Sequence, residues 1–349
     1  MSFVDKYVER RISKNTFFLH MSKLLDWDAL EKELVKITKR GENDRGCKAY
    51  NPLLLFKMQL ISVWYNLSDV QTEEMVNDSL SAMRFCGLNI EDDVPDHSTL
   101  SRFRSQLTQK KSYDRMLRKV NKQLKSKKII LTNGQAKVDA SITESPFNPK
   151  GKKTYELAED RSEDQRSGGE KEKEENYHKL KEVEQRGADK DGRWVVKGGK
   201  AKFGYKKQIG TDANGIILGV HTTPANTHDS KGLEPLIKKI PKRERKTVMG
   251  DKGYAGKDND KMLKANGSKS RIMKKARRNH PLTNWEKKYN RAISKTRWVV
   301  ERTFGGMKRW FGSGVTRLKG IKKVHGLHVL EAIAHNLKRS PGLVCQMAK

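Results

Sequence analysis

The chain has 349 residues, enough for a large hydrophobic core and for more than one domain. Lysine and arginine total 74 against 42 acidic residues, a formal net charge of +32. This excess favours a polyanionic partner, because each phosphate contact releases a condensed counterion. We find no run of about 18 apolar residues and no signal peptide, so we expect no membrane span and a cytoplasmic location. The three cysteines lack zinc or disulfide spacing.

Residues 1–130 predict an all-α domain. Asn51 and Pro52 mark the start of an apolar helix, because Pro is tolerated at the first helical position, and Ser68 begins a capping box that opens another helix. Asp96 or Ser98 would cap a later helix, which carries Arg102 and Arg104 on its polar face. Short capped helices that end in a basic one are typical of helix-turn-helix-like DNA-binding units, although other helical packing domains give the same pattern. A helical domain is therefore predicted, and DNA recognition by these two arginines is a hypothesis.

Residues 131–349 predict a second domain built on a mixed sheet. Its first three strands are expected next to one another and antiparallel, and the later strands are joined through helices, which gives an α+β fold with flanking helices. We expect strands at 137–142, 201–211, 215–223, 247–251 and 270–273, and helices at 229–240, 257–266 and 285–309.

Charge is unevenly distributed in this second domain. Residues 151–190 contain 10 Lys/Arg and 12 Asp/Glu without an apolar stripe, which predicts an exposed helix or a mobile insertion between the first two strands. Residues 266–325 contain 18 Lys/Arg and only two acids, Glu286 and Glu301. We therefore expect nucleic acid to lie along the second stretch.

Three carboxylates occupy positions that suit phosphodiester chemistry. Asp139 lies in the first strand and Asp251 closes the fourth. If these two strands are parallel neighbours, both side chains emerge at the same edge of the sheet. Glu301 lies on the long basic helix. Carboxylate oxygens beside phosphate favour Mg²⁺, with Mn²⁺ as a substitute, and two such ions can activate the attacking oxygen and stabilise the leaving one.

The helix at 285–309 predicts two faces. Arg297, Glu301 and Lys308 lie on the face opposite its apolar stripe. The alternative to a catalytic role for Glu301 is an ordinary surface ion pair with Arg297. Lys252 and Tyr254 follow Asp251 closely enough to contact substrate, but turn structure explains both residues equally well. The stripe, expected to pack, consists of Trp285, Tyr289, Ala292, Thr296, Val299, Thr303 and Met307.

Several tryptophan and histidine residues are candidates for base stacking or zinc binding. Core burial is the commoner fate of tryptophan, so we expect it for Trp194, Trp298 and Trp310 rather than stacking on a base. Histidines 325, 328 and 335 have no further ligands at a zinc spacing, which indicates packing or phosphate contacts on the last helix.

Considered together, the segments around these residues resemble the IS5-like insertion-sequence transposases, a branch of the DDE transposases. One matching segment ends the helical domain, two surround the aspartates, one surrounds the glutamate and one lies in the last helix. They span residues 94–104, 138–142, 250–254, 297–308 and 335–339.

The resemblance implies an RNase H-like core and a metal-dependent DNA transposase. Its partners would be the terminal inverted repeats of the element and the target DNA, with a homo-oligomer in the DNA complex. Two alternatives stay open: an RNase H-like nuclease without strand transfer, and a catalytically silent DNA-binding protein derived from a transposase. The implied catalytic and metal-binding residues are Asp139, Asp251 and Glu301, and the expected DNA contacts are Arg297, Lys308, Lys252, Arg102 and Arg104.

Overall fold

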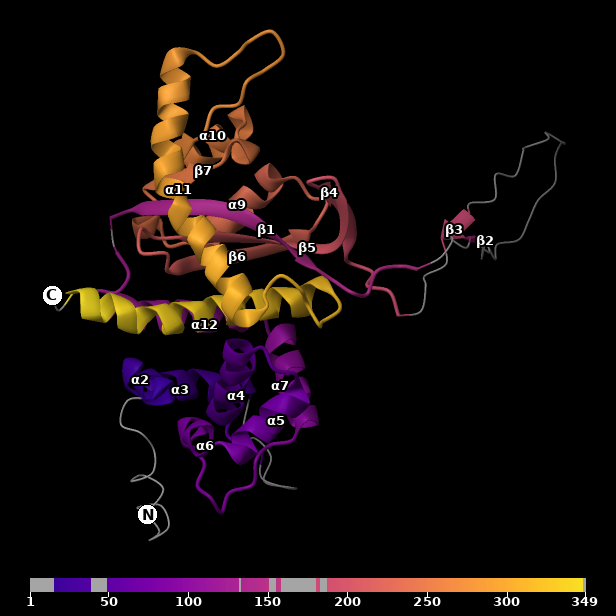
Figure 1. Ribbon diagram of the computed structural model, residues 1–349, viewed down its shortest axis with the longest axis vertical. Coiled ribbons are helices and arrows are strands. Elements are labelled where there is room, and N and C mark those ends of the chain that lie inside the picture. The colour runs from indigo at the N-terminus through magenta and orange to yellow at the C-terminus, as the bar shows by residue number, and fades with distance from the viewer. Residues whose placement is uncertain are drawn as a thin grey trace, which may run out of the picture.

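The computed structural model describes residues 16–38, 49–131, 133–150, 155–157, 180–182 and 187–347. Figure 1 shows three levels: helices from the N-terminal part, then one long helix across the middle, then the sheet with its own helices. The N-terminal helices are α2 (Phe17–Leu24), α3 (Trp27–Thr38), α4 (Pro52–Tyr65), α5 (Asp69–Asp78), α6 (Leu80–Cys86), α7 (His97–Gln109) and α8 (Tyr113–Ser126).

The predicted caps begin three of these helices. The Asn51 side chain accepts a hydrogen bond from the backbone N–H of Leu53, which places Pro52 in the first turn of α4. Ser68 forms the expected capping box with Gln71, and Asp96 caps α7. Each cap satisfies backbone donors that have no partner inside the helix. The helical character expected for this part of the chain is confirmed.

The main sheet contains β1 (Gln135–Glu144), β4 (Arg193–Lys197), β5 (Lys200–Thr211), β6 (Ile217–Pro224), β7 (Thr247–Gly250) and β8 (Lys269–Ile272). Its strand order is β4-β5-β1-β7-β8, and β6 also pairs with β5. Strands β5 and β6 are antiparallel, as are β1 and β5, whereas β1, β7 and β8 run parallel. This arrangement of β6, β5, β1, β7 and β8 is that of an RNase H-like core, so the expected α+β fold is confirmed.

A side-chain turn closes the β5–β6 hairpin. Asp212 accepts hydrogen bonds from the backbone N–H groups of Asn214 and Ile216, at 2.9 and 2.8 Å. Gly215 follows with φ of +80°, a left-handed conformation that glycine adopts without steric cost. The hairpin expected at this position is therefore confirmed, with its turn fixed by Asp212.

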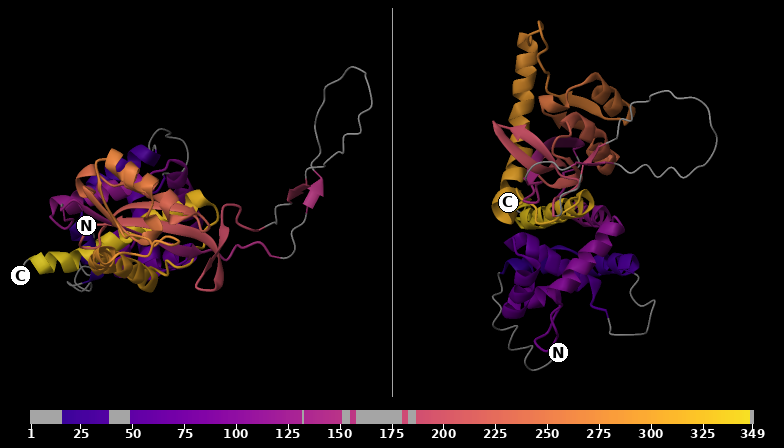
Figure 2. Two further views of the ribbon diagram at one scale, coloured as in Figure 1. Left: turned by 90° about the horizontal axis from the view of Figure 1, so that it is seen from above. Right: turned by 90° about the vertical axis from the view of Figure 1, so that its right-hand side faces the viewer.

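In the part of the chain that the structure describes, four α-helices accompany the sheet: α9 (Asp229–Lys239), α10 (Lys257–Ala265), α11 (Asn284–Phe311) and α12 (Ile321–Met347). Helix α12 lies between the sheet and the N-terminal helices in both side views (Figures 1 and 2) and packs against β6, α8 and α4. Asn336 on α12 accepts from the backbone N–H of Ile217 and donates to its carbonyl, and also donates to Asn121 of α8. The hydrophobic core is continuous from the helices to the sheet.

The charged segment expected at 151–190 lies mostly outside the described residues. A short pair, β2 (Tyr155–Leu157) and β3 (Leu180–Glu182), is described within it. Its last part belongs to the folded core. Asp189 is buried and accepts hydrogen bonds from the Tyr205 hydroxyl, at 2.7 Å, and from the backbone N–H of Gly320. Within the described part of the chain, no helix has the length and apolar character needed to span a bilayer.

Candidate active site

The register of two parallel strands brings the aspartates together. Strand β1 pairs with β7 from Gln135 opposite Thr247 to Lys137 opposite Met249. The same register, continued by two residues, places Asp139 beside Asp251, where β7 leaves the sheet. Adjacent strands lie about 4.8 Å apart, so the two carboxylates share one edge. Asp251 also begins the short turn that follows, accepting the backbone N–H of Lys252 at 2.6 Å.

Helix α11 crosses this edge and contributes the third carboxylate. It packs on β1 and β7 and directs Arg297 into the space between the acids. The Arg297 guanidinium lies 3.3 Å from Asp139, 3.6 Å from Asp251 and 3.6 Å from Glu301. Its side chain is 11% exposed, so the pair with Glu301 is not an ordinary surface pair. The structure therefore places all three candidate acids around one largely buried cation.

The electrostatics of this cluster favour a further cation. Three carboxylates surround one guanidinium, a formal excess of two negative charges. Burial raises the pKa of Asp139, and the neighbouring carboxylates of Asp251 and Glu301 raise it further, whereas Arg297 lowers it. An all-oxygen donor set with this charge fits a hard divalent ion. Among the described residues no three His, Cys, Asp or Glu side chains already lie at ligand spacing, because Arg297 stands between the acids.

Tyr254 lies directly beneath the site, and the sequence left its place open between substrate contact and turn structure. It is almost completely buried, and its hydroxyl has no hydrogen-bond partner among the described residues. Burial and the nearby carboxylates of Asp139 and Asp229 raise its pKa. A Cβ atom at Gly250 would lie 3.2 Å from the Tyr254 ring, so the glycine before Asp251 makes room for it. Tyr254 therefore packs under the carboxylate edge.

Two of the expected DNA contacts flank the cluster on the surface. Lys252 is exposed immediately after Asp251. Lys308 is exposed on α11 two turns beyond Glu301. Partial burial and the neighbouring Lys197 and Lys202 lower the pKa of Lys308, so it belongs to a local group of positive charges. Both lysines can reach a bound polyanion.

The structure separates the two arginines of α7. Arg102 is exposed, and its guanidinium contacts the hydroxyls of Ser98 and Thr99 on its own helix. Arg104 instead forms a two-bond ion pair with Asp69 at the start of α5 and is largely buried. Arg104 is therefore held inside the protein by Asp69, and Arg102 is the arginine of this pair whose guanidinium is exposed.

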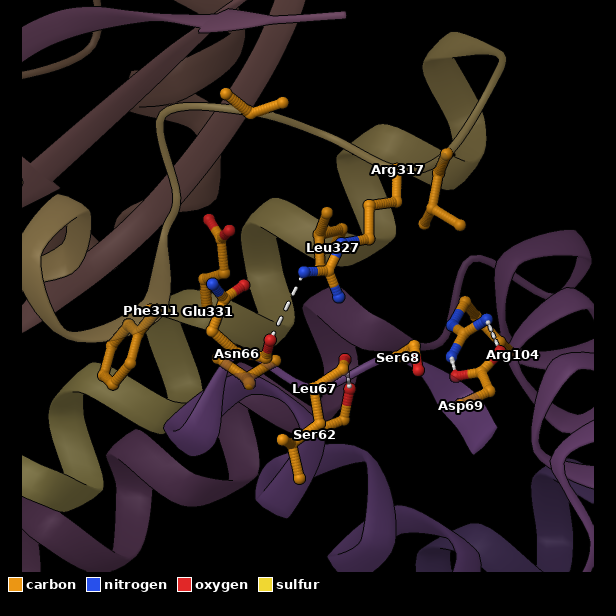
Figure 3. Close-up of a pocket in the computed structure, with 13 residues that line it drawn as sticks. Ser62, Asn66, Leu67, Ser68, Asp69, Arg104, Phe311, Arg317, Leu327 and Glu331 are labelled. Carbon is orange, nitrogen blue, oxygen red and sulfur yellow. Dashed lines mark hydrogen bonds and ion pairs between the residues drawn. The ribbon is translucent and has the colours of Figure 1, made fainter. Parts of the chain in front are cut away.

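Figure 3 shows where Arg104 lies. It borders a cavity of about 250 Å³ between the α4–α5 turn and the segment that joins α11 to α12. Arg317 crosses from that segment and donates to the backbone carbonyl of Asn66 at 3.4 Å. None of the three candidate acids lines this cavity. It is part of the junction between the N-terminal helices and α12.

Two further expectations concern packing. His328 and His335 are buried and hydrogen-bonded to Thr222 and to the carbonyl of Gly215, so they pack as expected. The expectation of core burial is wrong for three tryptophans, because local helix and edge-strand geometry leaves much of each indole in solvent. Their exposed fractions are 47% for Trp194, 52% for Trp298 and 39% for Trp310.

Comparison with known proteins agrees with this fold and site. Residues 149–337 match the transposase DDE domain, and residues 6–106 match a second transposase domain (DUF772). Asp251 and Glu301 lie inside the first match, and Asp139 lies before its first residue. The transposase for insertion sequence element IS1106 of Neisseria meningitidis serogroup B is 36% identical over 240 residues, which cover 68% of this chain and 76% of that protein.

A solved structure, the Mos1 mariner paired end complex with Mn, aligns over 99% of this chain and 92% of that one. Its TM-score of 0.21 and 12% identity are too low to bear on fold or chemistry. The strand order and the acidic edge define an RNase H-like nucleic-acid enzyme. The domain match over more than half of the chain makes the assignment specific: the chain belongs to the DDE transposases of insertion sequences. Enzymes of this family bind DNA and use divalent metal ions to cut and transfer its strands.

Proposed function

We propose that Asp139, Asp251 and Glu301 are the catalytic carboxylates of this transposase and hold divalent ions, Mg²⁺ with Mn²⁺ as a substitute. The observation that carries the proposal is their convergence on Arg297 from β1, from the end of β7 and from α11. Divalent ions bound there would supply positive charge to the attacking and leaving oxygens. The oxygen donors and the excess negative charge support this choice of ion.

The neighbouring basic residues would hold the DNA backbone in place. Arg297 and Lys308 contact phosphates near the scissile bond, and Arg297 also orients Glu301 one turn away. Lys252 contacts a phosphate next to Asp251. Cleavage at the element end frees a 3′-hydroxyl, and that hydroxyl then attacks the target DNA without a covalent protein–DNA intermediate. These cations position the two strands rather than read their sequence.

The N-terminal helices would recognise the element itself. Arg102 is the exposed arginine of α7, and we propose that it contacts the terminal inverted repeats. The helical unit comprises about residues 1–130 and the catalytic unit residues 131–349. The active assembly is a homo-oligomer of an IS5-like transposase that holds element ends and target DNA in the prokaryotic cytoplasm.

Separate substitutions of the three acids test the catalytic assignment. Asp139→Asn, Asp251→Asn and Glu301→Gln are each expected to abolish cleavage of element-end DNA in Mg²⁺, because each removes a metal ligand. DNA binding is retained, since affinity comes mainly from Lys and Arg. Asp258→Asn, an exposed acid on α10, is the matched control and keeps full activity. Near-normal cutting by any of the three variants removes that residue from the site.

The same reactions distinguish the alternative functions. Wild-type protein supplied with target DNA should yield joined products in which the element 3′ end is linked to the target. Cutting without joined products supports a nuclease that lacks strand transfer. Binding without cutting supports a silent descendant of a transposase.

A further inference from the structure

The outer half of α11 presents an indole, Trp285, whose outer face nothing in the described structure covers. The stripe from Trp285 to Thr296 was expected to pack, but Trp285 is 64% exposed. It stacks on Tyr289 with ring centroids 5.2 Å apart and an angle of 16° between the planes, which leaves its other face free. Figures 1 and 2 show this end of α11 standing above the sheet. The expected packing of Trp285 is wrong because the helix extends past its support.

A groove follows this stripe toward the catalytic edge. It is a cavity of about 350 Å³ between α11 and β8, which has no strand on its outer side among the described residues. Its inner end reaches Thr296, which contacts Met249 at 3.5 Å and directly precedes Arg297. The residues that line the groove include Met249, Lys269, Arg271, Tyr289, Ala292 and Thr296. The groove therefore begins beside the carboxylate cluster and runs outward.

The surroundings of the groove are strongly basic. Residues 273–296, which we call the outer arm, contain eight Lys and Arg and a single acid, Glu286. Glu286 is used in the capping box that begins α11. All eight cations are exposed, and none forms an ion pair with another described residue. A second copy of this surface would bring like charge, whereas a polyanion complements it.

The outer arm is also held in a defined shape. The Asn290 side chain accepts from the backbone N–H of Lys274 at 2.7 Å and donates to its carbonyl at 2.9 Å. Arg277 and His280 exchange two backbone hydrogen bonds and close the loop. A surface that is already ordered loses less entropy when a ligand binds.

We propose that the outer arm binds the DNA strand that leaves the catalytic carboxylates. An unpaired base of that strand stacks on the free face of Trp285, and its phosphates lie along the cations of the arm. Stacking on an aromatic ring within a basic groove is a common mode of single-strand recognition and tolerates any base. The inference rests on the proposed function for its DNA substrate, but it concerns binding outside the carboxylate cluster.

Binding of oligonucleotides in metal-free buffer tests the arm without any cleavage. The probes are a dT oligonucleotide that carries one 2-aminopurine and a blunt duplex of unrelated sequence. Trp285→Ala should weaken binding of the single strand about 5- to 150-fold, the range for loss of one base–aromatic stack. It should not change the salt dependence and should restore 2-aminopurine fluorescence. Trp285→Phe should keep most of the affinity.

Charge substitution separates stacking from phosphate contact. The double variant Lys287→Gln/Lys288→Gln should flatten the slope of log K against log salt by about 1.4 on the single strand, because each contact contributes about 0.7. Trp194→Ala is the matched control, because it removes a half-exposed indole on β4, outside the arm. It should bind both probes as the wild type does.

Three results overturn the proposal. They are unchanged single-strand affinity in Trp285→Ala, an equal loss in Trp194→Ala, and a change of oligomeric state in Trp285→Ala by light scattering with unaltered DNA affinity. The last result would make the groove an interface between copies of the chain. Failure of the catalytic assignment gives a different signature, because acid variants that still cut DNA leave these binding measurements unaffected.

Discussion

Replacement of Arg297 should make the carboxylate cluster bind metal more tightly when no DNA is present. Its guanidinium lies within 3.6 Å of all three acids and occupies the space between them. A divalent ion entering the cluster must therefore displace this cation or accept its repulsion. Arg297→Ala removes that competition and leaves three carboxylates without a counter-charge.

The magnitude follows from the positions of the charges. Two unit charges 4 Å apart interact by about 4 kcal/mol at an effective dielectric constant of 20 and by about 1 kcal/mol in water. Arg297 is largely buried, but Glu301 is 57% exposed to solvent, so the interaction energy is closer to its value in water. A gain of about 1–2 kcal/mol corresponds to about 5- to 30-fold tighter binding of the ion.

The assay is a Mn²⁺ titration of the DNA-free protein, with free Mn²⁺ measured by electron paramagnetic resonance at fixed ionic strength. Arg291→Ala is the matched control, because it removes an exposed positive charge from the same helix away from the acids. It should change Mn²⁺ affinity little. Arg297→Ala should also lower the melting temperature without metal, and saturating Mn²⁺ should reduce that deficit.

The reasoning is refuted if Arg297→Ala binds Mn²⁺ no more tightly than the wild type. Weaker binding would mean that Arg297 holds the carboxylates in place for the metal rather than opposing it. An equal effect of Arg291→Ala would show that overall charge, and not the local contact, controls metal affinity.

Two further predictions concern stability. Glu331→Gln leaves Lys207 of β5, only 1% exposed, without its charged partner, and should cost about 3–5 kcal/mol in denaturant unfolding. Glu144→Gln, which breaks the more exposed pair with Lys202, should cost less than about 1 kcal/mol, and equal losses would contradict the argument. Burial lowers the pKa of His335 to about 4. Its folded form stays neutral while the unfolded chain takes up a proton near its ordinary pKa, so stability is complete above about pH 6.5 and about 3 kcal/mol is lost as the pH falls toward 4. His335→Gln should lose less stability than the wild type between pH 7 and pH 4, and an unchanged pH dependence in that variant would refute this.

Local rules account for the parts of the fold that the sequence predicted. The caps at Asn51, Ser68 and Asp96 depend on side chains within three residues of the helix start, so the local sequence is enough to predict them. The alternating pattern likewise located β1 and the β5–β6 hairpin. Strand β4 was missed because its residues are nearly all exposed and show no alternation in burial. A pattern-based prediction requires one face of a strand to be buried.

Contacts between distant residues account for what the sequence could not predict. Arg102 and Arg104 look equivalent on α7, but Asp69, 35 positions earlier, pairs with the second one. The position of Arg297 among three acids likewise depends on how α11 crosses β1 and β7. Periodicity predicts which residues share a face of a helix. Which part of that face packs against the sheet depends on the tertiary fold, which periodicity does not give.

The length of helix α11 sets the distance between the proposed DNA contacts. From Trp285 to Lys308 it spans about 35 Å at 1.5 Å per residue, which is about ten nucleotides of one strand at 3.4 Å each. Glu301 lies about two thirds of the way along this span. A strand that follows the helix would thus contact Lys308 on one side of the scissile bond and the outer arm on the other. The three acids then lie between two groups of cations that hold the DNA backbone. At this position on the basic helix, negative charge serves the reaction, whereas elsewhere along the helix it would repel the DNA.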